Sequence, residues 1–139
     1  MAEKTGGFLM KPEKKFFIIV VEDDEGIRMS LKELFGMEGF LVKSFPNGKE
    51  AKEYLDSLPG YVLPPNVILT DMEMPIMGGE ELLKFIKKKY SEKRRPPLMV
   101  AMSGNGSKYT AAINAGADIF LLKPVTRIGE KINELLKNK

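Results

Sequence analysis

Short apolar runs rich in β-branched residues alternate with segments of helical periodicity through most of this chain, and few folds accommodate that pattern. The alternation begins near Lys15, and five such units follow one another to the C-terminus. Strands that alternate with helices in this way are typical of a parallel sheet covered by helices on both faces. The first run, Phe16 to Val21, is apolar at every position, as expected of a central strand. The sequence therefore predicts an α/β fold.

The later strands are placed by their apolar runs and by the glycines and prolines that interrupt the pattern. The run 40–45 is less purely apolar than the others, which favours a place at the edge of the sheet. Each of the runs ends close to a polar residue, so the carboxyl ends of the strands carry most of the candidate chemistry. The expected strands are residues 16–21, 40–45, 66–70, 98–102 and 119–122.

Helical periodicity predicts a helix after each strand. Asn47 is the expected N-terminal cap of the second helix, because its side chain can accept a hydrogen bond from the first turn. The fourth helix is expected to be short, near 107–115, and to end at Gly116. The first helix should face the core along one stripe, formed by Ile27, Leu31, Leu34 and Phe35, before Gly36 and Gly39 stop it.

Length and composition restrict the possible functions. The chain has 139 residues, which predicts one domain at 15–139 after a flexible lead at 1–14. It contains no cysteine and no histidine, so disulfides, thiolate nucleophiles and the commonest general base are excluded. No apolar run approaches the roughly 20 residues of a membrane span. We therefore expect a cytoplasmic protein without a membrane span.

A cluster of basic residues at 87–95 is the visible source of the formal net charge of +3. No base-reading motif accompanies this cluster, so a solvated face is favoured over a nucleic-acid interface. We therefore expect no nucleic-acid partner.

The candidate site is found by reading the strand ends together. In an open parallel sheet, ligands bind outside the carboxyl ends of the strands, near the point where the strand order reverses. Acids, a hydroxyl and an amine are expected to converge there. These residues are Glu22, Asp23 and Asp24 after the first strand, Asp71 after the third, Ser103 after the fourth and Lys123 after the fifth.

Carboxylates crowded at one edge would repel one another unless a cation lay among them. A site with only oxygen ligands and open positions suits Mg²⁺ better than a Ca²⁺ cage. Asp71 would then be a nucleophile toward a phosphoryl group, with Lys123 and Ser103 contacting the phosphoryl oxygens. An alternative interpretation of Asp24 is that it caps the first helix. We therefore expect Glu22 and Asp23 to be the acids that face the metal.

Four segments together resemble the motifs of bacterial response-regulator receiver domains, in the order of that family. The segment from Asp71 to Gly79 is similar to the phosphoacceptor loop. The others are Val20 to Asp24, Met102 to Gly104, and Ala115 to Pro124. The resemblance implies a flavodoxin-like, doubly wound five-stranded parallel sheet in the order 2-1-3-4-5, with helices on both faces.

Carried over by position, the resemblance implies a role for each site residue. Asp71 becomes the phosphoacceptor, and Ser103 and Lys123 contact the phosphoryl group. Ser103 and Phe120 correspond to the switch positions that couple phosphorylation to an output surface. The implied Mg²⁺ ligands are Glu22, Asp23, Asp71 and the backbone carbonyl of Glu73.

The sequence predicts a stand-alone response regulator of a two-component phosphorelay. A histidine kinase or histidine phosphotransfer protein would donate the phosphoryl group, and the switch would change binding to a downstream protein target. The only catalysis expected is that of its own phosphorylation and dephosphorylation. Two alternatives stay open: a phosphohydrolase of the haloacid dehalogenase type, and a phosphate-independent receiver used as a binding module. The short segment after Ser103 departs from the family pattern, so the output surface is not predicted.

Overall fold

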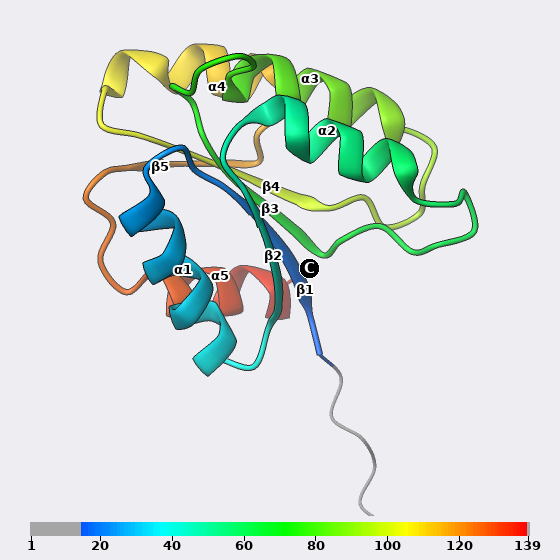
Figure 1. Ribbon diagram of the computed structural model, residues 1–139, viewed down its shortest axis with the longest axis horizontal. Helices are drawn as coiled ribbons and strands as arrows, with labels where there is room; N and C mark the ends of the chain where they lie inside the picture. Colours follow the sequence, from blue (N-terminus) through cyan, green and yellow to red (C-terminus); the bar gives the residue numbers. More distant parts are fainter. Residues whose placement is uncertain (1–14, 139) are drawn as a thin grey trace, which may run out of the picture.

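The computed structural model describes residues 15–138, and the expected lead at 1–14 lies outside them. One sheet of five parallel strands runs in the order β2-β1-β3-β4-β5, which confirms the predicted fold class (Figure 1). The less apolar second strand lies at an edge, as predicted. The strands are β1 Phe17–Val21, β2 Leu41–Phe45, β3 Val67–Asp71, β4 Leu98–Ser103 and β5 Ile119–Leu122.

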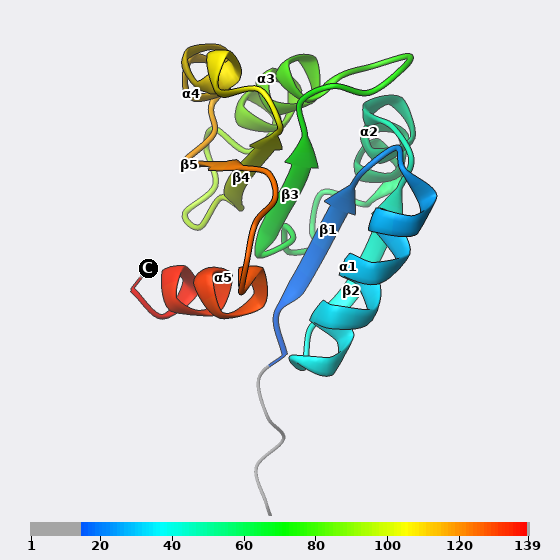
Figure 2. The ribbon, with the colours of Figure 1, turned by 90° about the vertical axis from the view of Figure 1, so that its left-hand side faces the viewer.

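Helices cover both faces of this sheet. Figure 1 shows α2, α3 and α4 on one face and α1 and α5 on the other, and Figure 2 shows the same layers from the side. None of the helices in residues 15–138 has the length and apolar character needed to cross a membrane. The helices are α1 Glu25–Met37, α2 Gly48–Ser57, α3 Gly79–Lys89, α4 Tyr109–Ala115 and α5 Ile128–Lys137.

Alternate residues of the central strands supply the two halves of the core. Ile19 and Ile68 are fully buried under α2, α3 and α4, whereas Ile18 and Leu69 are fully buried under α1 and α5. Side chains on a strand point alternately to opposite faces, so a strand covered on both sides must be apolar throughout. This requirement explains the apolar runs 17–21, 67–69 and 98–102 within β1, β3 and β4.

The apolar stripe predicted for α1 is only partly buried. Phe35 is completely buried and Leu31 is half-buried, but Ile27 and Leu34 remain 42% and 38% exposed. The neighbouring helix α5 meets α1 at its C-terminal end, where Asn133 donates a hydrogen bond to Glu38. Ile27 lies at the opposite end of α1, so a prediction from periodicity alone overstated its burial.

Two residues predicted to mark the ends of helices have the expected roles. The Asn47 side chain accepts a hydrogen bond from the backbone N–H of Glu50 and caps α2. Gly116 follows α4 with a φ of +121°, a backbone conformation that residues other than glycine rarely adopt. The fourth helix is short, seven residues after a single 3₁₀ turn at Gly106–Lys108.

Gly79 begins α3 at a point where two backbone segments come very close. Its φ is not positive, and a Cβ atom there would lie 2.3 Å from the Asp71 carbonyl oxygen. Gly79 is therefore needed because the start of α3 lies directly against the end of β3. The positive φ in this loop, 70°, falls on Ile76, whose side chain is 75% exposed.

Candidate functional site

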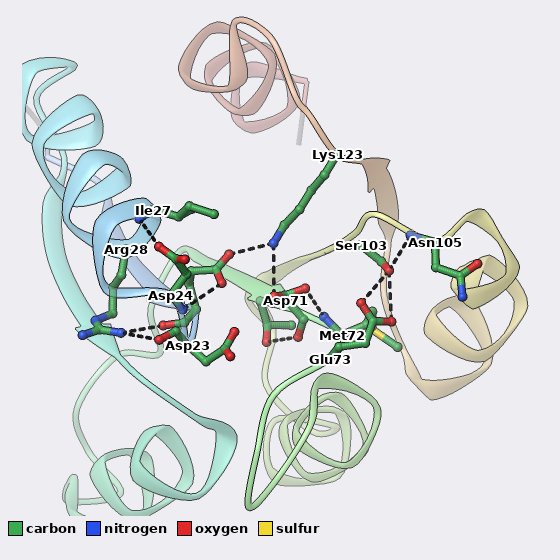
Figure 3. Close-up of polar contacts among 12 residues, drawn as sticks. Asp23, Asp24, Ile27, Arg28, Asp71, Met72, Glu73, Ser103, Asn105 and Lys123 are labelled. Carbon is green, nitrogen blue, oxygen red and sulfur yellow. Dashed lines mark hydrogen bonds and ion pairs between the residues drawn. The ribbon is translucent and has the colours of Figure 1, made fainter.

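The carboxyl ends of β1, β3, β4 and β5 bring the predicted site residues to one edge of the sheet. Figure 3 shows Asp71 between the acidic β1–α1 loop on one side and the pair Ser103 and Glu73 on the other. The Lys123 side chain extends toward Asp71 from the end of β5. The parallel register places these strand ends at the same level, since Val21 pairs with Thr70 and Asp71 with Met102.

Three acids form a compact cluster. Glu22 and Asp71 are buried, with exposed fractions of 1% and 5%, whereas Asp23 is open to solvent. One carboxylate oxygen from each of them lies within 4.8 Å of the other two. Buried carboxylates this close are costly without a compensating positive charge.

Lys123 supplies part of that compensation. Its Nζ lies 2.8 Å from Glu22 Oε1 and 3.1 Å from Asp71 Oδ2. Burial acts to lower the pKa of Lys123, but the hydrogen bonds to Glu22 and Asp71 outweigh it, so the pKa is raised. Burial raises the pKa of Glu22, and the hydrogen bond from Lys123 opposes that shift. The ammonium group is therefore the charged partner of two buried acids.

Backbone N–H groups hold the acids in place. The N–H of Met72 donates to Asp71 Oδ1 at 2.9 Å, and the N–H of Asp24 donates to Glu22 Oε2 at 3.2 Å. The Asp24 side chain accepts from the N–H of Ile27 and caps α1. The structure therefore places Asp24 at the helix end, outside the acidic cluster.

Arg28 belongs to the site and was missed by the sequence-based reasoning. Its guanidinium donates to the backbone carbonyls of Glu22 at 2.8 Å and Asp23 at 3.3 Å. These contacts tie the loop that carries both acids to the first turns of α1. The sequence feature that pointed to this role is a long basic side chain about one helical turn after the acids at 22–24.

Ser103 is fully buried at the end of β4, and its hydroxyl contacts Glu73. The Ser103 Oγ lies 2.8 Å and 3.0 Å from the two carboxylate oxygens of Glu73, and it accepts a hydrogen bond from the N–H of Asn105. The sequence indicated a role only for the backbone carbonyl of Glu73. The Glu73 side chain is therefore a second member of the site that was not predicted.

Phe120 lies in β5 and is partly buried against the core. Its ring packs edge-on against Tyr109 at the start of α4, with the ring centroids 5.8 Å apart. The contact joins β5 to the short helix that follows Ser103. Its predicted switch role stays a prediction.

The oxygen donors fit a hard divalent cation. Glu22, Asp23 and Asp71 offer three carboxylates at one point, and the exposed side of Asp23 leaves room for water ligands, which Mg²⁺ usually retains. The cluster contains no nitrogen or sulfur ligand, because the chain has no histidine and no cysteine. This donor set favours Mg²⁺ over softer transition metals.

Comparisons with known proteins agree with this geometry. Residues 18–135 match the model of the response regulator receiver domain. The chain is 37% identical over 108 residues to the DNA-binding transcriptional regulator NtrC of Proteus hauseri, a match that covers 76% of this chain and 21% of NtrC. It is 32% identical to the two-component response regulator ORR5 of Oryza sativa, with 78% of each chain covered. Because the relatives differ this much in length, the stand-alone state stays a prediction.

Solved structures show the same fold. A CheY-like receiver domain protein from Methanospirillum hungatei is 28% identical with a TM-score of 0.76, and the match covers 90% of this chain and 96% of that one. TrrA from Thermotoga maritima, solved in complex with Mg²⁺ and BeF, is 24% identical with a TM-score of 0.71 and covers 88% and 97%. The match across residues 18–135, on a sheet with this strand order, shows that the chain belongs to the response regulator receiver domain family of two-component systems.

Proposed function

We propose that this receiver domain accepts a phosphoryl group on Asp71 and passes the resulting change of shape to a protein partner. The observation that carries the proposal is the position of Asp71. Asp71 is 5% exposed, lies at the end of a central strand, contacts Lys123, and belongs to the acidic cluster with Glu22 and Asp23. The family assignment favours this function over the haloacid dehalogenase alternative.

The reaction is a transfer in which one bond forms and one breaks. An oxygen of the Asp71 carboxylate bonds to phosphorus while the bond from phosphorus to the donor breaks, and the leaving group keeps the electron pair. Mg²⁺ held by Glu22, Asp23, Asp71 and the Glu73 backbone carbonyl would offset the charge on the phosphoryl oxygens. Lys123 would donate to one phosphoryl oxygen and Ser103 to another.

The donor would be a histidine kinase or a histidine phosphotransfer protein, and the recipient of the signal a downstream protein. Receiver domains are signalling modules, and their own slow dephosphorylation is the only turnover that we propose. Phe120 and Ser103 would couple the acyl phosphate to the surface around α4 and β5, since Phe120 contacts Tyr109 there. The kinase and the target are proposed by class only.

The test is phosphoryl uptake from acetyl phosphate in the presence of Mg²⁺. Wild-type protein should gain one phosphoryl group per chain, detected by intact-mass spectrometry, and lose it slowly. Asp71→Asn should gain none and keep its fold, because the two side chains are nearly the same shape. Asp56→Asn, an exposed acid on α2, is the matched control and should label normally. Label on the Asp71→Asn protein would move the acceptor elsewhere, and repeated rapid turnover by the wild type would support a hydrolase.

A further inference from the structure

The Ser103 hydroxyl is already occupied by a partner that the proposed function does not use. Ser103 is completely buried, and both oxygens of the Glu73 carboxylate lie within hydrogen-bond distance of its Oγ, at 2.8 Å and 3.0 Å. The backbone N–H of Asn105 approaches the same Oγ at 3.0 Å. Figure 3 shows this pair beside Asp71, on the side away from Asp23.

Counting donors fixes the direction of these hydrogen bonds. An ionised carboxylate only accepts, and an N–H only donates, so the hydroxyl must give its single hydrogen to Glu73 and accept from Asn105. A phosphoryl group on Asp71 would require the same hydrogen. One hydroxyl hydrogen cannot serve both acceptors well, so Glu73 and the phosphoryl group compete for Ser103.

The negative charge of Glu73 also opposes a phosphoryl group on Asp71. Its carboxylate lies two residues after Asp71, and within residues 15–138 the polar contacts shown for it are those with Ser103. Lys123, the cation at the centre of the site, contacts Glu22 and Asp71. A phosphoryl group on Asp71 would add negative charge beside the Glu73 carboxylate.

From this competition we infer that the Glu73 side chain is a latch, which holds Ser103 in its unphosphorylated position and opposes the switched state. The inference rests on the proposed function, because it needs a phosphoryl group on Asp71 as the competing acceptor. Hydrogen bonds to a charged group are stronger than those between neutral groups, so the latch weakens capture of the hydroxyl by the phosphoryl group. Glu73 thus sets how completely the domain switches.

Beryllofluoride with Mg²⁺ probes the latch at equilibrium, since it imitates a phosphoryl group on the aspartate. Glu73→Ala removes the acceptor and the charge, whereas Glu73→Gln removes the charge but keeps a weaker acceptor. Glu73→Ala should bind beryllofluoride roughly threefold or more tightly than wild type, with Glu73→Gln between them. Glu81→Ala and Glu81→Gln, at an exposed glutamate in the first turn of α3, are the controls for net charge and should bind like wild type.

The two Glu73 variants separate a latch from simple repulsion. Equal gains in beryllofluoride affinity for Glu73→Ala and Glu73→Gln would overturn the latch, because charge repulsion alone predicts equal gains. No gain in affinity for either variant would also overturn it. In a Ser103→Ala background the difference between the two variants should disappear, since there is no hydroxyl to hold. A difference that persists in that background would count against the inference.

A second measurement needs neither Mg²⁺ nor beryllofluoride. The N–H of Asn105 donates to Ser103 Oγ, so its signal in an amide NMR spectrum reports how the hydroxyl is held. Glu73→Ala should shift this signal in the metal-free protein, and Glu81→Ala should not; an unchanged signal would overturn the latch. If the wild-type protein binds no beryllofluoride at all, the proposed function fails, and the Asn105 signal still decides whether Glu73 holds Ser103.

Discussion

Lys123 lies between two buried carboxylates that would otherwise repel each other. Its Nζ contacts Glu22 and Asp71, and 24% of its side chain is exposed. The same ammonium group is the one proposed to contact a phosphoryl oxygen. The residue that neutralises these buried acids is therefore also the one proposed to stabilise the phosphorylated site, and its removal should affect both states.

Lys123→Met keeps the length of the side chain but removes its charge. Removing Lys123 leaves two buried carboxylates without their hydrogen-bond donor, so the metal-free variant should be less stable than wild type by about 1–3 kcal/mol. Mg²⁺ should recover more stability in the variant than in wild type, because it supplies the missing positive charge. Urea unfolding with and without MgCl₂ measures both quantities, and an identical response to Mg²⁺ in the two proteins would contradict the assignment.

The raised pKa of Lys123 gives the same variant a pH dependence. A group whose pKa is higher in the folded than in the unfolded state contributes its full stability below the unfolded pKa, and loses it as pH rises through the folded pKa. The stability difference between wild type and Lys123→Met should therefore shrink in strong alkali, where Lys123 of the wild type loses its proton. A difference that does not change in strong alkali would be inconsistent with the ion pairs.

Among the elements, the junction of β3 and α3 is the tightest near the site. A Cβ on Gly79 would lie 2.3 Å from the Asp71 carbonyl oxygen and 2.9 Å from Met72 Cα, both of them backbone atoms that cannot turn aside. The first turn of α3 is thus packed against the residue proposed to accept the phosphoryl group. A change in this junction would move Asp71 itself.

Gly79→Ala should destabilise the protein by more than about 2 kcal/mol and weaken labelling of Asp71, because the clash can be relieved only by shifting backbone. Gly36→Ala is the matched control: Gly36 lies within α1, and a Cβ there meets nothing within 4 Å. It should stabilise the fold by about 0.5–1 kcal/mol, the usual gain of alanine over glycine in a helix. Thermal unfolding of both variants measures the contrast, and two changes of the same sign would contradict it.

The sequence predicted the elements and the residues at their ends well, because strand runs and helix caps are local signals. Asn47 and Gly116 act through their own segments, and the structure shows both in the expected roles. The exposure of Ile27 and the closeness of Gly79 to Asp71 were not predictable in this way. Both depend on where a different element lies, and periodicity carries no information about that.

The same distinction applies to the site. Glu22, Asp71 and Lys123 could be grouped from the sequence, since parallel strands end at one edge of the sheet and the structure brings these side chains into contact. The contacts of Arg28 and of the Glu73 side chain could not, because each depends on a rotamer chosen among several. Ile76 adds a further case: its φ of 70° falls on a β-branched residue where a glycine would be expected.

At the scale of the whole molecule, the site joins segments that are far apart in the chain. Lys123 contacts Glu22 across 101 positions and Asp71 across 52, so the acidic cluster proposed to hold Mg²⁺ is assembled only when the sheet is formed. A ligand that binds only the folded state stabilises it by mass action, by about 2.7 kcal/mol at a concentration 100 times its Kd. Mg²⁺ should therefore raise the unfolding temperature of the entire domain.

Asp23→Asn should remove most of this stabilisation, since it replaces one of the three clustered carboxylates with a neutral amide. The metal-free protein should lose no stability, because Asp23 is exposed and its charge adds to the repulsion within the cluster. Asp24→Asn is the control one residue away: asparagine caps a helix as well as aspartate does, and Asp24 caps α1. Its unfolding temperature should rise with MgCl₂ as in wild type. An equal loss of the Mg²⁺ effect in both variants would indicate general attraction to an acidic surface, and the three-carboxylate site would then be wrong.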